Sequence, residues 1–429
     1  MGKIMAEIIP LRAWRYNQQI AGDIDDLTSP PFDEMSEKYR LGLYEHPYNS
    51  IHLSVPIGKD PPAQAAEILN DWKHKKVLVR DRASGLYVYY QYFTLPGNPR
   101  EYCRKGFICN IRNYDWEENV VLRHEKTNPQ SVDFRVALRA AMQLNVSPTH
   151  GLYSDTSFTL EKHMDQSMRH PIYETEDYQG VRNVLSIIND EAVINQFIQK
   201  LEGKQVIMAD GHHRYESSLA YMKRQMANNP DHRGNEGYNY HLIYLTNTES
   251  DDIRILPTHR LIKGIKNFNE TAIMKKIEKF FSVRPLADKY YMDKVILGEK
   301  WTFGLLFKEN AYRVRLKPEA FSALKWNFAE QVKNLDLTVM HYFIIEKALG
   351  IPGNIQPKSD CIEYNRNFAV CMTKVISGDA QMALITRDIA IDDVLQVCCS
   401  GYTMPQKSTY FYPKVICGYV FGSIAENED

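Results

Sequence analysis

A short apolar run that stops at a polar turn and leads into an amphipathic helix constrains the fold of this chain most strongly. The run covers residues 206–209, Gly211 opens the turn, and apolar residues then recur at helical spacing, at Leu219, Met222 and Met226. We predict a strand, a tight turn and a helix in that order. Such an arrangement places backbone N–H groups and the positive end of a helix dipole at one point, where an anion can bind.

The side chains of this turn suit anion binding. Gly211 permits close approach of the backbone or a positive φ, and Arg214 offers a planar fork for phosphate or carboxylate. His212 and His213 can donate hydrogen bonds, while Asp210 is a candidate base or metal contact. The alternative is that Asp-Gly serves only the geometry of the turn. We favour ligand binding, because polar loops on rigid scaffolds tend to carry function.

Length and composition indicate a soluble globular chain of two or three domains. It has 429 residues, 24% of them charged, and a formal net charge of −1, so it lacks the basic excess typical of nucleic-acid or membrane binding. No apolar run suggests a membrane span, and the start does not resemble a secretory signal. Seven cysteines without metal-type spacing fit free thiols in a reducing compartment. We expect a cytoplasmic protein that acts on a small molecule and binds neither nucleic acid nor membrane.

The pattern along the chain predicts an α/β (α+β) protein with two lobes. We predict helices at 61–72, 134–142 and 193–201, strands at 86–93, 106–111 and 241–246, a strand within 46–53, and a polar loop at 161–180. After a boundary near residue 250 we predict a helix at 271–281, strands at 301–307 and 312–316, and a helix at 337–349. The predicted lobes are 1–250 and 251–429, with the loop 404–414 returning to the site of the first lobe.

Further clusters of polar side chains lie on other loops. One cluster, Asp33-Glu34, follows a proline-rich segment, and another lies at 123–127 after an apolar segment. The cluster at 123–127 can equally be the solvent-exposed start of a helix. Two more lie at 258–260 and 407–409. Lys407-Ser408-Thr409 invites comparison with a P-loop, but the glycine frame of that motif is missing.

Several common catalytic motifs are absent from the sequence. It contains no GxSxG, HExxH, paired CxxC or GxGxxG, so serine hydrolysis, a zinc site and a dinucleotide fold lack support. What remains is a set of basic side chains and carboxylates on separate loops. That set suits phosphate recognition, in which catalysis consists mostly of positioning and charge neutralisation.

Six motifs occur in the order typical of a known family. They are Pro30-Pro31-Phe32-Asp33, Pro47-Tyr48-Asn49, His124-Glu125-Lys126-Thr127, Ala209-Asp210-Gly211-His212-His213-Arg214-Tyr215-Glu216, Leu256-Pro257-Thr258-His259-Arg260 and Met404-Pro405-Gln406-Lys407-Ser408-Thr409. Over nearly its whole length the chain resembles the bacterial domain-of-unknown-function family 1015. The Asp-Gly-His-His-Arg turn is in addition similar to the phosphate-binding turn of the ParB/sulfiredoxin-like fold, which includes partition proteins, sulfiredoxins and free-serine kinases.

This resemblance implies roles for the residues of the turn. Gly211, His212, His213 and Arg214 would bind a phosphate of a nucleotide or of pyrophosphate. Asp210 would correspond to the acidic residue before the turn in the serine kinases. Sulfiredoxin chemistry is not implied, because a histidine stands where that family has a reactive cysteine, and no helix-turn-helix follows as in the partition proteins.

We therefore expect a ParB/sulfiredoxin-like core that transfers a phosphate from ATP, ADP or pyrophosphate to a small hydroxyl compound such as free serine, with Mg²⁺ as a candidate cofactor. The candidate bases are Asp33, Glu34, Glu125 and Asp210. Further expected phosphate contacts are His124, Lys126, Thr127, His259, Arg260, Lys407, Ser408 and Thr409. Two alternatives remain: a nucleotide sensor without activity, and a metal-assisted phosphohydrolase in which His124, His212, His213 and His259 gather the metal.

Overall fold

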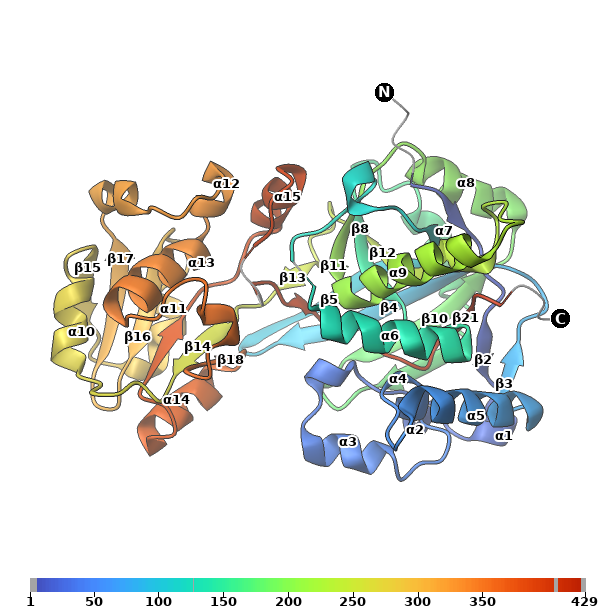
Figure 1. Ribbon diagram of the computed structural model, residues 1–429, viewed down its shortest axis with the longest axis horizontal. Helices are drawn as coiled ribbons and strands as arrows, with labels where there is room; N and C mark the ends of the chain where they lie inside the picture. Colours follow the sequence, from blue (N-terminus) through green and yellow to red (C-terminus); the bar gives the residue numbers. More distant parts are fainter. Residues whose placement is uncertain (1–5, 126, 405–407, 426–429) are drawn as a thin grey trace. The chain divides into compact units, whose positions relative to one another are not determined.

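The chain forms two compact units. The computed structural model describes residues 6–125, 127–404 and 408–425. Unit 1 comprises Met1–Ile253 and Pro413–Asp429, and unit 2 comprises Arg254–Tyr412 (Figure 1). The chain thus leaves unit 1 close to the predicted boundary at 250. It also returns to unit 1 after residue 412, so residues 413–429 belong to unit 1, whereas the predicted second lobe extends from 251 to 429.

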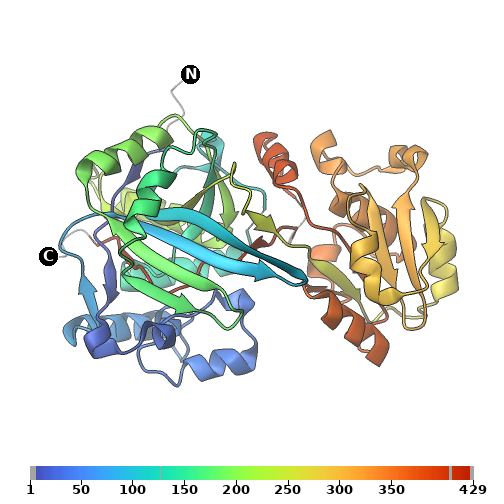
Figure 2. The ribbon, with the colours of Figure 1, turned by 180° about the vertical axis from the view of Figure 1, so that it is seen from behind.

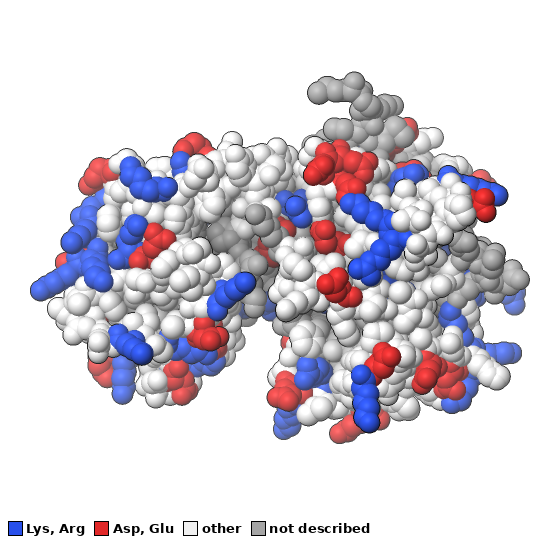
Figure 3. Space-filling view, in the orientation of Figure 1, with Lys and Arg blue, Asp and Glu red and all other residues white. Residues whose placement is uncertain are grey.

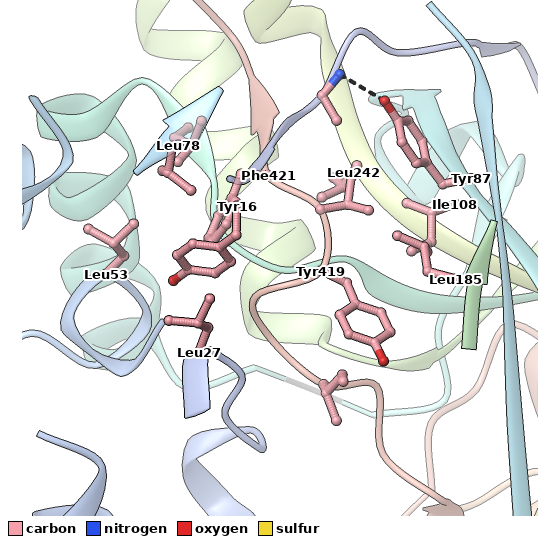
Figure 4. Packing of buried hydrophobic residues seen from close by; sticks show 14 of the residues in the cluster. Tyr16, Leu27, Leu53, Leu78, Tyr87, Ile108, Leu185, Leu242, Tyr419 and Phe421 are labelled. Atoms are coloured by element: carbon pink, nitrogen blue, oxygen red, sulfur yellow. Dashed lines mark hydrogen bonds between the residues drawn. The ribbon is translucent and has the colours of Figure 1, made fainter. Parts of the chain in front are cut away.

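The returning segment belongs to unit 1 because it supplies part of that unit's core. Phe421 is fully buried against Tyr16, with ring centroids 5.6 Å apart, and the Tyr16 ring lies 5.9 Å from that of Trp72. Tyr419 is buried in the same cluster of hydrophobic side chains (Figure 4). Its hydroxyl donates a hydrogen bond of 2.8 Å to the Asn183 carbonyl. Burial of aromatic rings of this size dominates core energetics, so the last segment is held firmly in unit 1.

A large mixed sheet organises unit 1. Its described strands run in the order β6-β11-β8-β12-β5-β4-β10-β9, with β1 also paired to β5. Neighbours are antiparallel except β6 with β11 and β8 with β12, which are parallel. The long β4–β5 hairpin is seen best from behind (Figure 2). The strands are β1 Ile8–Ile9, β4 Leu86–Leu95, β5 Asn98–Arg112, β6 Val121–Leu122, β8 Thr149–Tyr153, β9 Tyr173–Glu176, β10 Arg182–Ile188, β11 Val206–Asp210 and β12 Tyr240–Asn247.

Helices and two small sheets surround this sheet. α6 and α9 pack side by side, and α5 packs against α6 (Figure 1). The helices are α1 Gln18–Ala21, α2 Ile24–Leu27, α3 Glu37–Leu43, α4 Ile51–Ser54, α5 Pro61–His74, α6 Pro129–Met142, α7 Glu161–Ser167, α8 Glu191–Leu201 and α9 His212–Asn228. The small sheets pair β2 Trp14–Tyr16 with β3 Leu78–Arg80, and β7 Leu144–Asn145 with β21 Gly422–Ser423.

Most sequence-based assignments in unit 1 are confirmed, including the strands at 86–93, 106–111 and 241–246. The helix predicted from residue 61 is α5, in which the Asp60 side chain accepts from the Ala63 N–H and Pro61 occupies the first turn. Ala65, Leu69 and Trp72 form its buried face.

Two assignments in unit 1 are wrong. The segment 46–53 ends in helix α4 rather than a strand, because the Asn49 side chain accepts from the Ile51 N–H at 2.9 Å and turns the chain. The predicted loop 161–180 contains helix α7 and strand β9, which bury Met164 and Tyr173 among otherwise polar residues.

Unit 2 is built on its own antiparallel sheet, in the order β15-β17-β16-β19-β14-β18, next to a two-stranded β13–β20 sheet. The predicted strand pair at 301–316 is confirmed, and the helix predicted at 337–349 is α13 continued by a π-helix, Met340–Ala348. The strands are β13 Arg254–Ile255, β14 His259–Ile262, β15 Phe281–Pro285, β16 Thr302–Leu306, β17 Ala311–Leu316, β18 Ile362–Asn365, β19 Met382–Ile385 and β20 Phe411–Tyr412. The helices are α10 Glu270–Ile277, α11 Met292–Val295, α12 Glu330–Lys333, α13 Asp336–Val339, α14 Phe368–Ser377 and α15 Ile391–Cys399.

The predicted α/β class with a second α+β lobe is confirmed by these two units. Within the residues that the structure describes, no helix combines the length and the apolar character needed to cross a membrane.

Candidate functional site

The predicted strand–turn–helix is confirmed and forms the centre of the site. Strand β11 lies between β6 and β8, and helix α9 begins one residue after it. Gly211 joins the two at φ +90°. A Cβ atom here would lie 2.6 Å from Thr149 Cγ2 and 3.0 Å from Arg214 Nε, so both the conformation and the space require glycine.

The start of α9 has no side-chain cap. The Gly211 carbonyl accepts the N–H groups of Arg214 and Tyr215, and no side chain caps the helix. The first N–H groups of a helix have no acceptor within it, and the dipole of a 17-residue helix adds partial positive charge there.

Asp210 holds two cationic side chains at this turn. Its Oδ2 accepts from Arg214 Nη2 at 3.0 Å, and its Oδ1 accepts from Lys414 Nζ. The three side chains are 23%, 16% and 9% exposed, respectively. Burial alone would raise the pKa of Asp210, but the charges of Lys414 and Arg214 hold it well below its ordinary value. Asp210 is therefore ionised and engaged through both oxygens.

Arg214 is fixed from two sides. Besides Asp210, its guanidinium donates through Nη1 to Ser147 Oγ and to the Pro148 carbonyl, each at 2.8 Å. Its position is thus set by the segment before β8 as well as by the turn.

Arg104 adds a third cation. It is buried on β5, where Nη2 donates to the Gln91 side chain and to the Pro413 carbonyl. Its Nε and Nη1 have no hydrogen-bond partner among the described residues. Burial lowers the pKa of Arg104, and the charge of Asp210 is among those that oppose this. Asp210 is thus paired directly with Arg214 and Lys414 and interacts with Arg104 at longer range, so these four side chains carry three positive charges and one negative charge.

Buried histidines complete the cluster without adding charge. The rings of His124 and His212 are 4.7 Å apart, edge to face. Burial lowers the pKa of His124 to about 4 and that of His212 well below its ordinary value. His212 Nε2 is buried and has no hydrogen-bond partner among the described residues. His150, which pairs with Asp210 across β8 and β11, is also neutral through burial and through the neighbouring charge of Arg104.

The loop after His124 also reaches the start of α9. His213 Nε2 accepts from the Asn128 N–H at 2.9 Å, so the loop that carries the half-buried Glu125 and Thr127 is attached to the first turn of α9. Lys126 lies outside the described residues.

The remaining predicted residues lie on other elements of the fold. Asp33 and Glu34 belong to a short 3₁₀ helix, Phe32–Glu34, whose last carbonyl accepts from the Tyr178 hydroxyl. His259 and Arg260 are buried on β14 of unit 2, where Arg260 donates to His341 and to the Thr258 carbonyl. Ser408 and Thr409 also belong to unit 2, and Lys407 lies outside the described residues. Closure of these loops over the turn stays a prediction.

The metal alternative gains no support from the described part of the chain. There, no three His, Cys, Asp or Glu side chains gather closely enough to hold a metal ion. Of the four histidines proposed for that role, His124 and His212 lie together in unit 1, whereas His259 belongs to unit 2.

Lys414 and Arg104 are the site residues that sequence reasoning missed. Lys414 stands in a stretch of polar and aromatic residues, 404–414, in which Lys407 drew attention through its resemblance to a P-loop. Arg104 stands in the middle of a β-prone run, where a lone arginine more often faces solvent. Only its burial reveals its role.

Comparisons with known proteins agree with the family resemblance found in the sequence. The family described as "Protein of unknown function (DUF1015)" matches residues 8–338. No curated protein matches the chain. The solved structures that resemble it include a free serine kinase variant in complex with AMP, at 11% identity and a TM-score of 0.36 over 70% of this chain and 88% of that one.

Two further structures are similar to a comparable degree. They are a conserved hypothetical protein from Pyrococcus furiosus (10% identity, TM-score 0.34, 71% and 92% of the two chains) and SbnI from Staphylococcus aureus (10%, 0.35, 75% and 90%). Free-serine kinases are among the proteins of the ParB/sulfiredoxin-like fold, which the sequence predicts for the core of this chain. At such TM-scores these likenesses carry no argument about the reaction.

Proposed function

Since the chain belongs to DUF1015, a family of proteins of unknown function, we propose its function from its own site: it binds the phosphate groups of a nucleotide or of pyrophosphate at the start of α9. The observation that carries this proposal is the excess of positive charge around Asp210. Arg214 and Lys414 contact one carboxylate and Arg104 interacts with it at longer range, next to an uncapped helix start.

The burial of this charge favours a small anion over a nucleic acid. On the face of unit 1 seen in Figure 3, acidic and basic side chains are interspersed over the surface. The three cations of the site are instead buried or nearly so, and electrostatic attraction is stronger in such an environment than in water. A phosphate group small enough to reach the turn would benefit from all three.

The finer proposal is phosphoryl transfer to a small hydroxyl compound such as free serine. It rests on the resemblance of the turn to that of free-serine kinases. Arg214, Lys414 and the helix start would neutralise charge on the transferred group, and ATP, ADP or pyrophosphate would be the donor. Any Mg²⁺ would be held largely by the phosphates, as is usual for this ion.

Asp210 is poorly suited to be the base in such a reaction, because its pKa is far below neutrality and both oxygens are engaged. Its role would be to position Arg214 and Lys414. Glu125 is the better candidate base, because its loop is tied to the start of α9 through Asn128 and His213.

Calorimetry with ADP, ATP and pyrophosphate tests the binding step, with Lys414→Met as the variant. Loss of one charge-assisted hydrogen bond costs about 1.5–3 kcal/mol, so the affinity should fall by a factor of roughly 10–150. Arg224→Gln is the control for the loss of one positive charge, because Arg224 is an exposed arginine of α9. Equal affinities of both variants and the wild type, or no binding at all, would reject the proposal.

A second candidate function is nucleotide sensing without chemistry. The engaged state of Asp210 favours it, because this removes the carboxylate nearest to the turn as a base. Phosphorus NMR of protein mixed with ATP, ADP or pyrophosphate and with serine distinguishes the two: a new phosphoester signal establishes transfer, whereas binding without turnover selects the sensor.

A further inference from the structure

A cavity of unit 1 opens beside helix α6. It encloses about 450 Å³, including the space at its mouth, between α6, the segment before β8 and the first turns of α9. Its polar lining includes Arg135, Arg139, Asn145, Ser147, Arg214 and His241, besides two further serines. Three of these side chains are arginines, and no aspartate or glutamate appears among the described residues that line the cavity.

Arg139 is the most informative of these arginines. It is 6% exposed, and its Nη2 lies 3.3 Å from His241 Nδ1. Its Nη1 has no partner among the described residues. Burial lowers the pKa of Arg139 to about 10, which leaves it charged at neutral pH. His241 offers no counter-charge, since burial and the charges of Arg139 and Arg214 hold its pKa far below neutrality. A buried cation without a counter-charge is strongly unfavourable.

Asn145 is an independent indication of a ligand. It is 4% exposed and lines the same cavity. Within the described structure neither its Oδ1 nor its Nδ2 has a hydrogen-bond partner, although buried amides are normally satisfied. An oxyanion in the cavity could accept from both Asn145 Nδ2 and Arg139 Nη1.

We propose that this cavity binds the phosphate or carboxylate group of a small molecule, with Arg139 and Asn145 as donors. The site is distinct from the helix start at Gly211 and shares only Arg214 with it. Arg214 sends Nη2 to Asp210 and Nη1 to Ser147, a residue of the cavity lining. A ligand in the cavity therefore acts on an arginine of the Asp210 site.

The stability of an Arg139→Met variant separates a ligand site from a structural arginine. A ligand-binding arginine without a counter-charge destabilises the empty protein, and replacement of buried charges by apolar groups is often neutral or stabilising. The variant should then have a Tm equal to or above that of the wild type. A structural arginine predicts a lower Tm.

Thermal shift provides the direct test, with inorganic phosphate and acetate compared against sodium chloride at equal ionic strength. The wild type should gain Tm in phosphate, in acetate or in both, and the responding anion identifies the group that the cavity takes. Arg139→Met should abolish the part of the gain that Lys414→Met retains, and Asn145→Ala should weaken the apparent affinity about tenfold, as expected for the loss of one hydrogen bond to a charged ligand. Arg224→Gln and Lys414→Met should retain the gain.

Three results would overturn the proposal: no gain beyond chloride in the wild type, a gain as large in Arg139→Met as in the wild type, or a gain that Lys414→Met abolishes. The last would place the anion at the start of α9. If Arg139→Met fails to fold, Asn145→Ala decides, because it keeps every charge. Nucleotide binding is measured separately, so failure here leaves the proposed function standing.

Discussion

Replacement of Asp210 by asparagine removes the negative charge between Arg214 and Lys414 while keeping the shape of the side chain. Both cations would then remain in place without a counter-charge, at 16% and 9% exposure. Breaking a buried ion pair by removal of one partner costs about 3–5 kcal/mol. Because Asp210 retains 23% exposure, we expect the lower end, roughly 3 kcal/mol of unit 1 stability.

Hydrogen exchange measured on peptides of β11 and β12 is the suitable assay. It reports the opening free energy of unit 1 by itself, whereas a single unfolding curve of a two-unit chain mixes two transitions. Asp133→Asn is the matched control, because the Asp133 carboxylate lies 3.7 Å from Arg224 with both side chains more than half exposed. Exposed pairs contribute at most about 1 kcal/mol.

A double-variant cycle makes the reasoning sharper. Adding Lys414→Met to Asp210→Asn removes one of the unpaired cations, so the double variant should be more stable than Asp210→Asn alone. Asp210 does not hold the cations in this way if Asp210→Asn lowers stability no more than Asp133→Asn does. The same conclusion follows if Lys414→Met lowers the stability of the wild type and of the Asp210→Asn variant by the same amount, because Asp210 would then not be coupled to Lys414.

Three further predictions follow from the same contacts. Gly211→Ala should lower the stability of unit 1 by roughly 2–5 kcal/mol, because it combines a positive φ with a steric clash. Gly22 has φ +97° but no atom within 4 Å of its Cβ position, so Gly22→Ala should lower the stability by about 1–2 kcal/mol. Hydrogen exchange of unit 1 compares the two variants. His124 has a folded-state pKa of about 4, below its unfolded value of roughly 6.5. Between these two pH values the unfolded state binds a proton that the folded state does not, so the free energy of unfolding is highest above pH 6.5 and decreases as the pH falls towards 4. His124→Gln should therefore flatten the loss of stability in that range, by at most about 1.4 kcal/mol per pH unit, and an unchanged slope would contradict the neutral state. Phe421→Ala should cost about 3–5 kcal/mol in unit 1 and leave exchange in unit 2 unchanged; an effect on unit 2 alone would show that the returning segment is misassigned.

The local pattern of the sequence was sufficient for the turn and for most regular elements. Gly211 followed a short apolar strand and preceded a periodic helix, and these local signals determine β11 and α9. The segment 46–53 was predicted wrongly because its apolar residues fit a strand, while a single hydrogen bond from the Ile51 N–H to Asn49 favours a helix. Such a contact leaves no periodic signal.

The full set of residues at the site could be identified only from the fold. Lys414 is 204 residues away from Asp210, and Arg104 reaches the cluster from the centre of β5. Neither distance along the chain nor periodicity links such residues, since their proximity is created by strand order and by the return of the chain to unit 1. The same holds for Arg139, which reads as a surface arginine on an amphipathic helix until its burial is known.

A crystal structure of the protein with bound pyrophosphate or ADP tests the central claim most directly. We predict a phosphate group at the start of α9, within hydrogen-bond distance of the first N–H groups of the helix and of Lys414 Nζ or the Arg214 guanidinium. A phosphate bound elsewhere, with the Asp210–Lys414 and Asp210–Arg214 pairs undisturbed and the helix start occupied only by water, would contradict it.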